Sequence, residues 1–210
     1  MMHAIHGNLI QSTDLFSNAK FSLAYQDYEE SRHDRKFQDD WLRHRTENVK
    51  ALSFNLDFDK EINDNLLYYG FEYVYNSVSS KAKEENIITG KELPVQTRYP
   101  DGDNDYNALA AYVSYKMDLG DKVNFITGLR YSYFSINSTI DTSTPYFNFP
   151  FHSLSLNTGA LNGSLGLVYR PGDTWKLDLN ASSGFHAPNI DDMAKVFDSE
   201  PGSVVMPNEE

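Results

Sequence analysis

The 210-residue sequence contains no cysteine, which excludes disulfides, thiolate metal ligands and cysteine nucleophiles. It also contains no run of about 18 apolar residues, the length that a transmembrane helix requires. No stretch shows apolar residues recurring with a long helical period. The sequence therefore offers neither a membrane-spanning helix nor a long amphipathic one.

Positive charge is scarce, because 18 Lys and Arg stand against 30 Asp and Glu for a formal net charge of −12. A chain of this charge repels a phosphate backbone, so we expect no nucleic-acid partner. Motifs that carry chemistry are also missing: there is no G-x-S-x-G elbow, no H-E-x-x-H pair and no glycine-rich phosphate loop before a helix. We therefore expect no enzyme, no cofactor and no metal site.

Aromatic residues are abundant, with 14 Tyr and 13 Phe, and they favour strands. Apolar and polar residues alternate along the chain, most cleanly in residues 175–182, WKLDLNAS. Because alternate side chains of a strand point to opposite faces, each such segment forms a two-faced strand. We predict seven strands, near residues 20–28, 41–58, 65–78, 106–117, 122–137, 160–170 and 174–184.

The connections between these strands alternate in length. Short turns are expected at residues 57–65, 118–121 and 171–174, and long connections at residues 27–50, 79–105 and 137–158. Outer-membrane barrels alternate short periplasmic turns with long extracellular loops, and apolar stretches of roughly 7 to 11 residues suit their apolar band of ~25 Å. We therefore predict an all-β fold over residues 1–210, an antiparallel up-and-down meander of about seven strands that is part of a larger transmembrane β-barrel.

Both ends of the sequence are expected to be cut from a longer chain. The first residues have neither the basic nor the apolar region of an export signal. The tail, residues 185–210, ends in polar sequence typical of a loop, where a complete barrel would end on a closing strand. We expect the tail to be a truncated extracellular loop.

Two groups of residues could suggest metal chemistry. The acidic run from Asp101 to Asp105 begins like a calcium loop, but Tyr106 and Tyr112 stand where an EF-hand requires Gly and Glu. An acidic loop tip is the simpler interpretation. The histidines at positions 33, 44, 152 and 186 are expected on separate loops, and nothing in the sequence requires them to converge.

Three motifs stand near the carboxyl end: SGFHAPNIDD at residues 183–192, VFDSEPG at residues 196–202 and VVMPN at residues 204–208. They resemble motifs of TonB-dependent receptors, particularly those of Bacteroidetes. The segments AYQDYEESRHDR at residues 24–35 and LYYGFEY at residues 67–73 are similar to barrel strands of the same family. The resemblance runs from about Asn8 to the end of the chain.

The resemblance implies a 22-stranded barrel with a plugged lumen. Such a receptor binds a scarce solute, an iron-siderophore, haem, vitamin or glycan, and imports it with energy from TonB. The implied partners are outer-membrane lipid, a small extracellular ligand, and the TonB complex, acting through a plug domain that we expect in the parent protein outside these residues. The family's haem receptors carry an FRAP box and an NPNL box with a haem-binding His between them. Here His186 replaces the Arg of the first box and no His lies between Asn189 and Met206, so a haem ligand does not follow from the motif.

Ligand contacts are expected among aromatic and acidic residues of the extracellular rim, namely Tyr99, Asp101, Asp103, Asp105, Tyr106, Tyr146, Phe147 and His186. Two other hypotheses share the same strand pattern. A passive porin or adhesin barrel would lack the plug. A soluble carbohydrate-binding β-sandwich would pack its apolar faces against each other.

Overall fold

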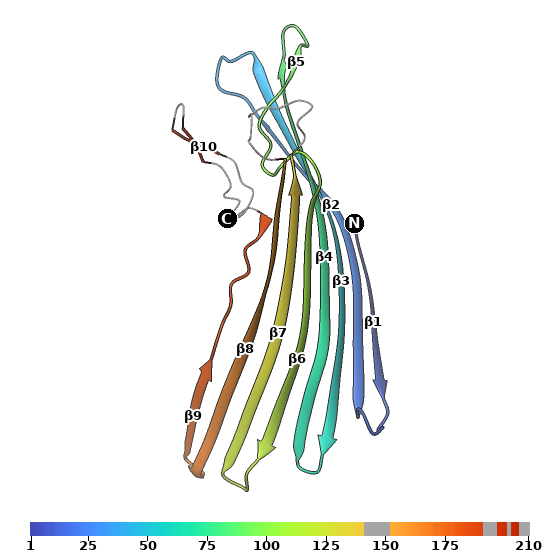
Figure 1. Ribbon diagram of the computed structural model, residues 1–210, viewed down its shortest axis with the longest axis vertical. Coiled ribbons are helices and arrows are strands. Elements are labelled where there is room, and N and C mark those ends of the chain that lie inside the picture. The colour runs from blue at the N-terminus through green and yellow to red at the C-terminus, as the bar shows by residue number, and fades with distance from the viewer. Residues whose placement is uncertain (141–151, 191–196, 201–202, 206–210) are drawn as a thin grey trace.

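The computed structural model describes residues 1–140, 152–190, 197–200 and 203–205. Within these residues a nine-stranded antiparallel sheet is accompanied by a two-stranded sheet (Figure 1). The large sheet contains β1 (Met2–Ile10), β2 (Asn18–Asp34), β3 (Trp41–Ile62), β4 (Asn65–Asn86), β5 (Glu92–Pro94), β6 (Asn104–Asp118), β7 (Val123–Thr139), β8 (Ser153–Gly172) and β9 (Trp175–Ser182). The small one pairs β10 (Phe197–Glu200) with β11 (Ser203–Val205).

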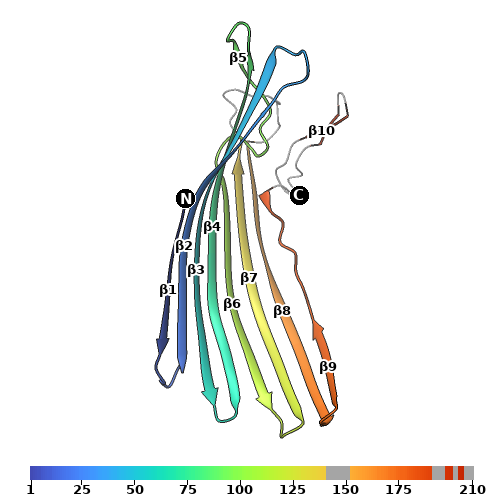
Figure 2. The same ribbon diagram turned by 180° about the vertical axis from the view of Figure 1, so that it is seen from behind.

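The large sheet is an up-and-down meander. Its order is β1-β2-β3-β4-β6-β7-β8-β9, and β5 pairs with the end of β4 outside this path. Each strand is therefore hydrogen-bonded to its neighbour in sequence, apart from the short excursion of β5. The predicted all-β antiparallel fold is confirmed. Across the described residues the sheet is open, with β1 at one edge and β9 at the other (Figures 1 and 2).

The sequence prediction missed β1, the short strand β5 and the β10–β11 pair, which falls in the tail that was expected to be a loop. Met2–Ile10 pairs in unbroken register with β2, from Met2 opposite Gln26 to Ile10 opposite Asn18. Its alternation is weak, because Ala4 and His6 occupy one face and Gly7 interrupts the other. Pairing with a strongly patterned neighbour supplies the order that the segment's own sequence does not signal.

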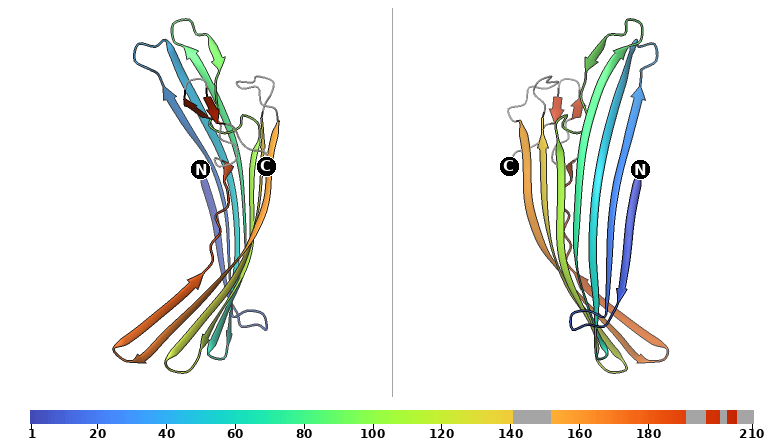
Figure 3. Two further views of the ribbon diagram at one scale, coloured as in Figure 1. Left: turned by 60° about the vertical axis from the view of Figure 1, so that its left-hand side comes forward. Right: turned by 90° about the vertical axis from the view of Figure 1, so that its right-hand side faces the viewer.

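Several strands continue beyond their apolar segments toward the long loops. Residues 27–50, expected as a long connection, are strand up to Asp34 and again from Trp41, so that only residues 35–40 form the loop. Polar side chains do not prevent this, because ladder hydrogen bonds use the backbone. Figure 3 shows the resulting hairpins rising beyond the rest of the sheet.

The sheet is curved, and the chain that follows β9 lies on its concave side (Figure 3). A small buried cluster forms there from Val78, Ile136, Leu154 and Ile190. The other, convex face has no covering layer among the described residues, so the apolar faces of a β-sandwich are not formed. In the same residues no helix is long and apolar enough to cross a membrane.

Candidate functional site

The convex face is a continuous apolar surface. Leu161 is 67% exposed and Leu179 69% exposed, although both belong to well-paired strands. The register places the apolar side chains of adjacent strands next to one another, as with Leu167 opposite Leu179. The exposed apolar residues of this face include Phe21, Leu23, Phe71, Leu109, Val113, Leu129, Leu161, Leu165, Leu177 and Leu179. An exposed apolar surface of this extent marks a site of contact with lipid or with another apolar surface.

Tyrosines mark the upper limit of this apolar surface. Their rings lie on the convex face, and each hydroxyl donates a hydrogen bond to a polar side chain on the neighbouring strand, two residues nearer the loops than the tyrosine's own partner. The three pairs are Tyr73 with Asn107 at 3.0 Å, Tyr75 with Asp105 at 2.5 Å, and Tyr133 with Asn157 at 3.2 Å. An apolar ring with a hydrogen-bonded hydroxyl suits a membrane–water boundary.

Aromatic rings also mark the lower limit, near the short turns. Phe58 stacks on Tyr69 with ring centroids 5.0 Å apart, and Phe16 lies 5.5 Å from Phe58. On β8, Tyr169 lies ten residues below Gly159, the partner of Tyr133. Ten residues span about 34 Å of strand, or about 26 Å at a tilt of ~40°. The spacing of the two aromatic belts therefore matches the height of an outer-membrane apolar band.

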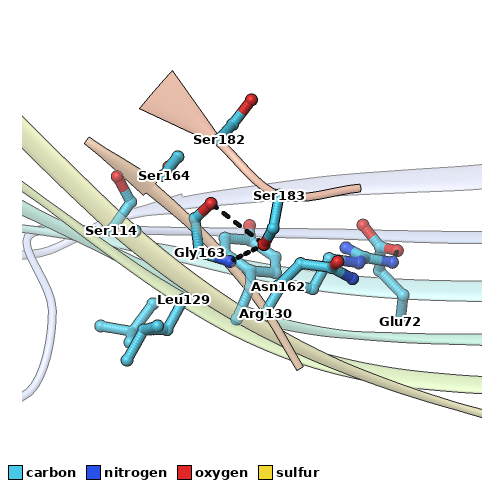
Figure 4. Close-up of a pocket in the computed structure, with 12 residues that line it drawn as sticks. Glu72, Ser114, Leu129, Arg130, Asn162, Gly163, Ser164, Ser182 and Ser183 are labelled. Atoms are coloured by element: carbon cyan, nitrogen blue, oxygen red, sulfur yellow. Dashed lines mark hydrogen bonds and ion pairs between the residues drawn. The ribbon is translucent and has the colours of Figure 1, made fainter. Parts of the chain in front are cut away.

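The concave face carries polar side chains across the middle of the sheet (Figure 4). Arg130 forms an ion pair with Glu72 and donates from Nε to Ser132 Oγ at 3.1 Å. Tyr112 donates to Asp57 Oδ1 at 2.7 Å. Asn162, Ser164 and Ser182 extend this polar surface, which lines a shallow hollow of about 340 Å³ together with Arg130 and Glu72. The arrangement is typical of a surface that faces water inside a barrel.

A larger cavity lies nearer the loops on the same face. Its volume is about 560 Å³. The sheet supplies one wall, and the segment after β9 supplies the other. The lining residues are Gln26, Tyr28, Val49, Ala51, Asn76, Val78, Tyr99, Tyr106, Ala187, Pro188, Asn189 and Ile190. Apolar walls with a few polar groups and aromatic rings are common in small-molecule sites.

The segment after β9 is held to the sheet at three points. Ser183 donates from its backbone to Gly163 O at 2.9 Å, and its Oγ accepts from Gly163 N at 2.9 Å (Figure 4). The Phe185 ring lies 5.7 Å from Phe134, and Ile190 is buried in the hydrophobic cluster. These contacts bring the SGFHAPNI motif over the sheet and close one side of the cavity.

Comparison with known proteins supports this geometry. The family model described as TonB dependent receptor-like, beta-barrel, matches residues 5–209. The chain belongs to this family. Among solved structures, the "Copper transporter OprC" superimposes with a TM-score of 0.68 at 11% sequence identity, covering 82% of this chain and 28% of that one. At this identity the likeness establishes the fold, and the chain spans less than a third of the transporter. No curated protein sequence matches the chain significantly.

In this TonB-dependent receptor barrel, Tyr99 and Tyr106 come together at the upper cavity although they lie on different elements. Tyr99 belongs to the loop before β6, and the Arg98 guanidinium lies 5.3 Å from its ring centroid. Asp105, adjacent to Tyr106, points to the convex face and binds Tyr75. Alternation along the strand separates these neighbours, so the structure does not bring Asp105 to the cavity.

The acidic loop is fixed largely through its backbone. Asp103 N donates to Thr139 Oγ1 at 2.7 Å, and the fully buried Asn104 side chain donates to Val78 O at 3.0 Å and Pro100 O at 2.8 Å. These bonds hold the loop containing Asp101 against β4 and β7. His186 is exposed on the segment after β9, and Tyr146 and Phe147 lie outside the described residues.

Most of the cavity wall was missed by the sequence analysis, which had named only Tyr99 and Tyr106 among its lining residues. Gln26, Tyr28 and Asn76 lie on strands, whereas the candidates were sought in loops. Strand alternation could have assigned all three to the polar face. They form a cavity wall only because the segment after β9 lies over them, and the sequence does not indicate where that segment will lie.

Charged side chains cover the hairpins above the cavity. Arg43 binds Glu84 at 2.7 Å, and the hydrogen bond from Lys83 to Glu92 raises the pKa of the Lys83 ammonium. The expectation that the histidines are scattered over loops is wrong for two of them. His33 and His44 lie on paired strands, directly opposite each other, because strand pairing extends beyond the apolar segments.

Proposed function

We propose that the chain is part of an outer-membrane receptor that binds a scarce extracellular solute and imports it with TonB-supplied energy. The single observation that carries the proposal is the contrast between the two faces of one sheet. The convex face is apolar between two aromatic belts, whereas the concave face is polar and lined by ion pairs. Lipid against the convex face and water against the concave face would each match the side chains found there.

The loop end of the concave face is the proposed place of solute capture. The upper cavity combines Tyr28, Tyr99 and Tyr106 with the amides of Gln26 and Asn76. Aromatic rings provide apolar contact, and the amides supply both donors and acceptors. A bulky solute such as a siderophore, haem, vitamin or oligosaccharide would suit this lining, and a receptor rather than an enzyme is the role it supports.

Single-cysteine labelling tests the membrane assignment. Because these 210 residues contain no cysteine, Leu165→Cys and the adjacent Ser164→Cys would each place one thiol in this region, on opposite faces. In outer-membrane vesicles containing the receptor, a spin label at position 165 should be relaxed by oxygen dissolved in lipid. A label at position 164 should be relaxed by a water-soluble nickel chelate. Equal aqueous accessibility at both positions would refute the proposal.

Solute capture and energy coupling need a second measurement. A fluorophore on Asn76→Cys should report binding of one class among ferrichrome, haemin, cyanocobalamin and maltodextrin. Filling the cavity with Ala51→Trp should abolish that response, whereas Ala111→Trp on the convex face should leave it intact. Uptake of the bound solute should stop when a protonophore removes the inner-membrane potential. Uptake that persists would instead indicate a passive porin.

A further inference from the structure

His33 and His44 form a close pair on the β2–β3 hairpin. The two residues are direct partners in the register of the strands, and their Nδ1 atoms lie 2.7 Å apart. The rings meet edge to face, with centroids 4.9 Å apart and planes inclined at 70°. His33 is exposed and His44 half-buried, so water and ions can reach the pair.

Two facing ring nitrogens offer the donor geometry of a chelate. When both rings are neutral, one Nδ1 carries a proton and donates a hydrogen bond, and the other Nδ1 accepts that bond. A metal ion that replaces this proton would bind both nitrogens at about 2.0 Å. Two such bonds at a right angle place the nitrogens about 2.8 Å apart, and a tetrahedral arrangement places them about 3.3 Å apart. The observed 2.7 Å is closer to the right angle, which is the preference of Cu(II) and Ni(II).

Glu85 lies beside His44. Its Oε2 lies 3.3 Å from His44 Nε2, within ion-pair distance but out of line for a hydrogen bond. A negative charge this close to the second nitrogen of a ligating imidazole stabilises the positive charge that metal binding draws onto the ring, and so strengthens the ring as a ligand. Lys83 lies opposite His44 on β4 and forms an ion pair with Glu92, which offsets the positive charge of its ammonium group.

We propose that His33 and His44 form an open site for a divalent transition metal ion, with Cu(II) bound most tightly. The Irving–Williams order places Cu(II) above Ni(II) and Zn(II) at nitrogen sites. Among the described residues no group of three or more His, Cys, Asp or Glu gathers as in a closed site. The remaining coordination positions therefore go to water or to a ligand carried by the metal.

The test uses Cu(II) alone, titrated into the chain in detergent micelles. His3→Gln is the background, because an imidazole close to the amino terminus can itself bind copper. We expect one strongly bound Cu(II) whose electron paramagnetic resonance spectrum shows two imidazole nitrogens, with Zn(II) bound more weakly. His33→Gln or His44→Gln should weaken binding at least tenfold, and Glu85→Gln about tenfold. His6→Gln, on the exposed strand β1, is the matched control and should change nothing.

Chemical protection gives a second measurement that needs no hairpin variant. Cu(II) should shield positions 33 and 44, and not positions 152 and 186, from diethylpyrocarbonate, as read by peptide mass spectrometry. Unchanged copper affinity in the double variant His33→Gln, His44→Gln would overturn the proposal. A spectrum with a single imidazole nitrogen, or modification of positions 33 and 44 at the same rate with and without Cu(II), would also overturn it.

Discussion

An arginine in place of Leu165 would test the membrane-facing surface most directly. Leu165 is 54% exposed on the convex face. On β8 it lies six residues from Gly159, which marks the upper aromatic belt, and four from Tyr169 in the lower belt. The position is therefore near the middle of the proposed apolar band. A charged side chain on the lipid face of a barrel costs about 2–4 kcal/mol at the bilayer midplane.

The adjacent residue provides a matched control. Ser164 is exposed on the concave face, where the polar hollow offers water and the side chains of Asn162 and Ser182. Ser164→Arg adds the same charge at the same depth but should cost only about 0–1 kcal/mol, the value of a surface substitution. The predicted difference between the two variants is thus about 2–3 kcal/mol.

Equilibrium unfolding in guanidinium chloride would measure this difference, with the receptor folded into phospholipid vesicles and followed by tryptophan fluorescence. A difference of about 2.8 kcal/mol corresponds to roughly a hundredfold change in the folding equilibrium. Equal effects of Leu165→Arg and Ser164→Arg would refute the assignment of the convex face to lipid. A larger effect at position 164 would reverse the two faces.

Three further predictions concern the concave face and its loop. A Cβ at Gly70 would lie 2.6 Å from the Tyr112 hydroxyl, so Gly70→Ala should displace that ring and cost about 1–3 kcal/mol in the same unfolding assay, with a smaller cost in a Tyr112→Ser background. A Cβ at Gly102 would lie 2.5 Å from a backbone oxygen of β7, so Gly102→Ala should release the acidic loop and speed its proteolysis, whereas Gly172→Ala, which meets nothing within 4 Å, should not. Glu72→Gln breaks an ion pair that is more than a third exposed, so the loss of unfolding free energy should stay below about 1 kcal/mol.

Sequence alternation alone was sufficient for the fold class. The clean two-faced pattern of residues 175–182 and its repeats predicted antiparallel strands, and the motifs around Phe185 pointed to the family that the comparison confirmed. Both signals are local, because side-chain alternation follows from strand geometry whatever the strand pairs with. The predicted ligand contacts in the acidic loop and at His186 remain predictions.

Tertiary structure decided the cavity, the histidine pair and the first strand. Tyr99 and Tyr106 line the same cavity, and the Asn104 side chain ties the loop that carries Tyr99 to the sheet. The local sequence does not determine which strand a segment will pair with, or where the segment after β9 will lie. His33 faces His44 because the β2–β3 register continues beyond the apolar residues. The sequence by itself determined which face of each strand is polar, and long-range pairing determined which polar groups meet, because register is a property of two strands together.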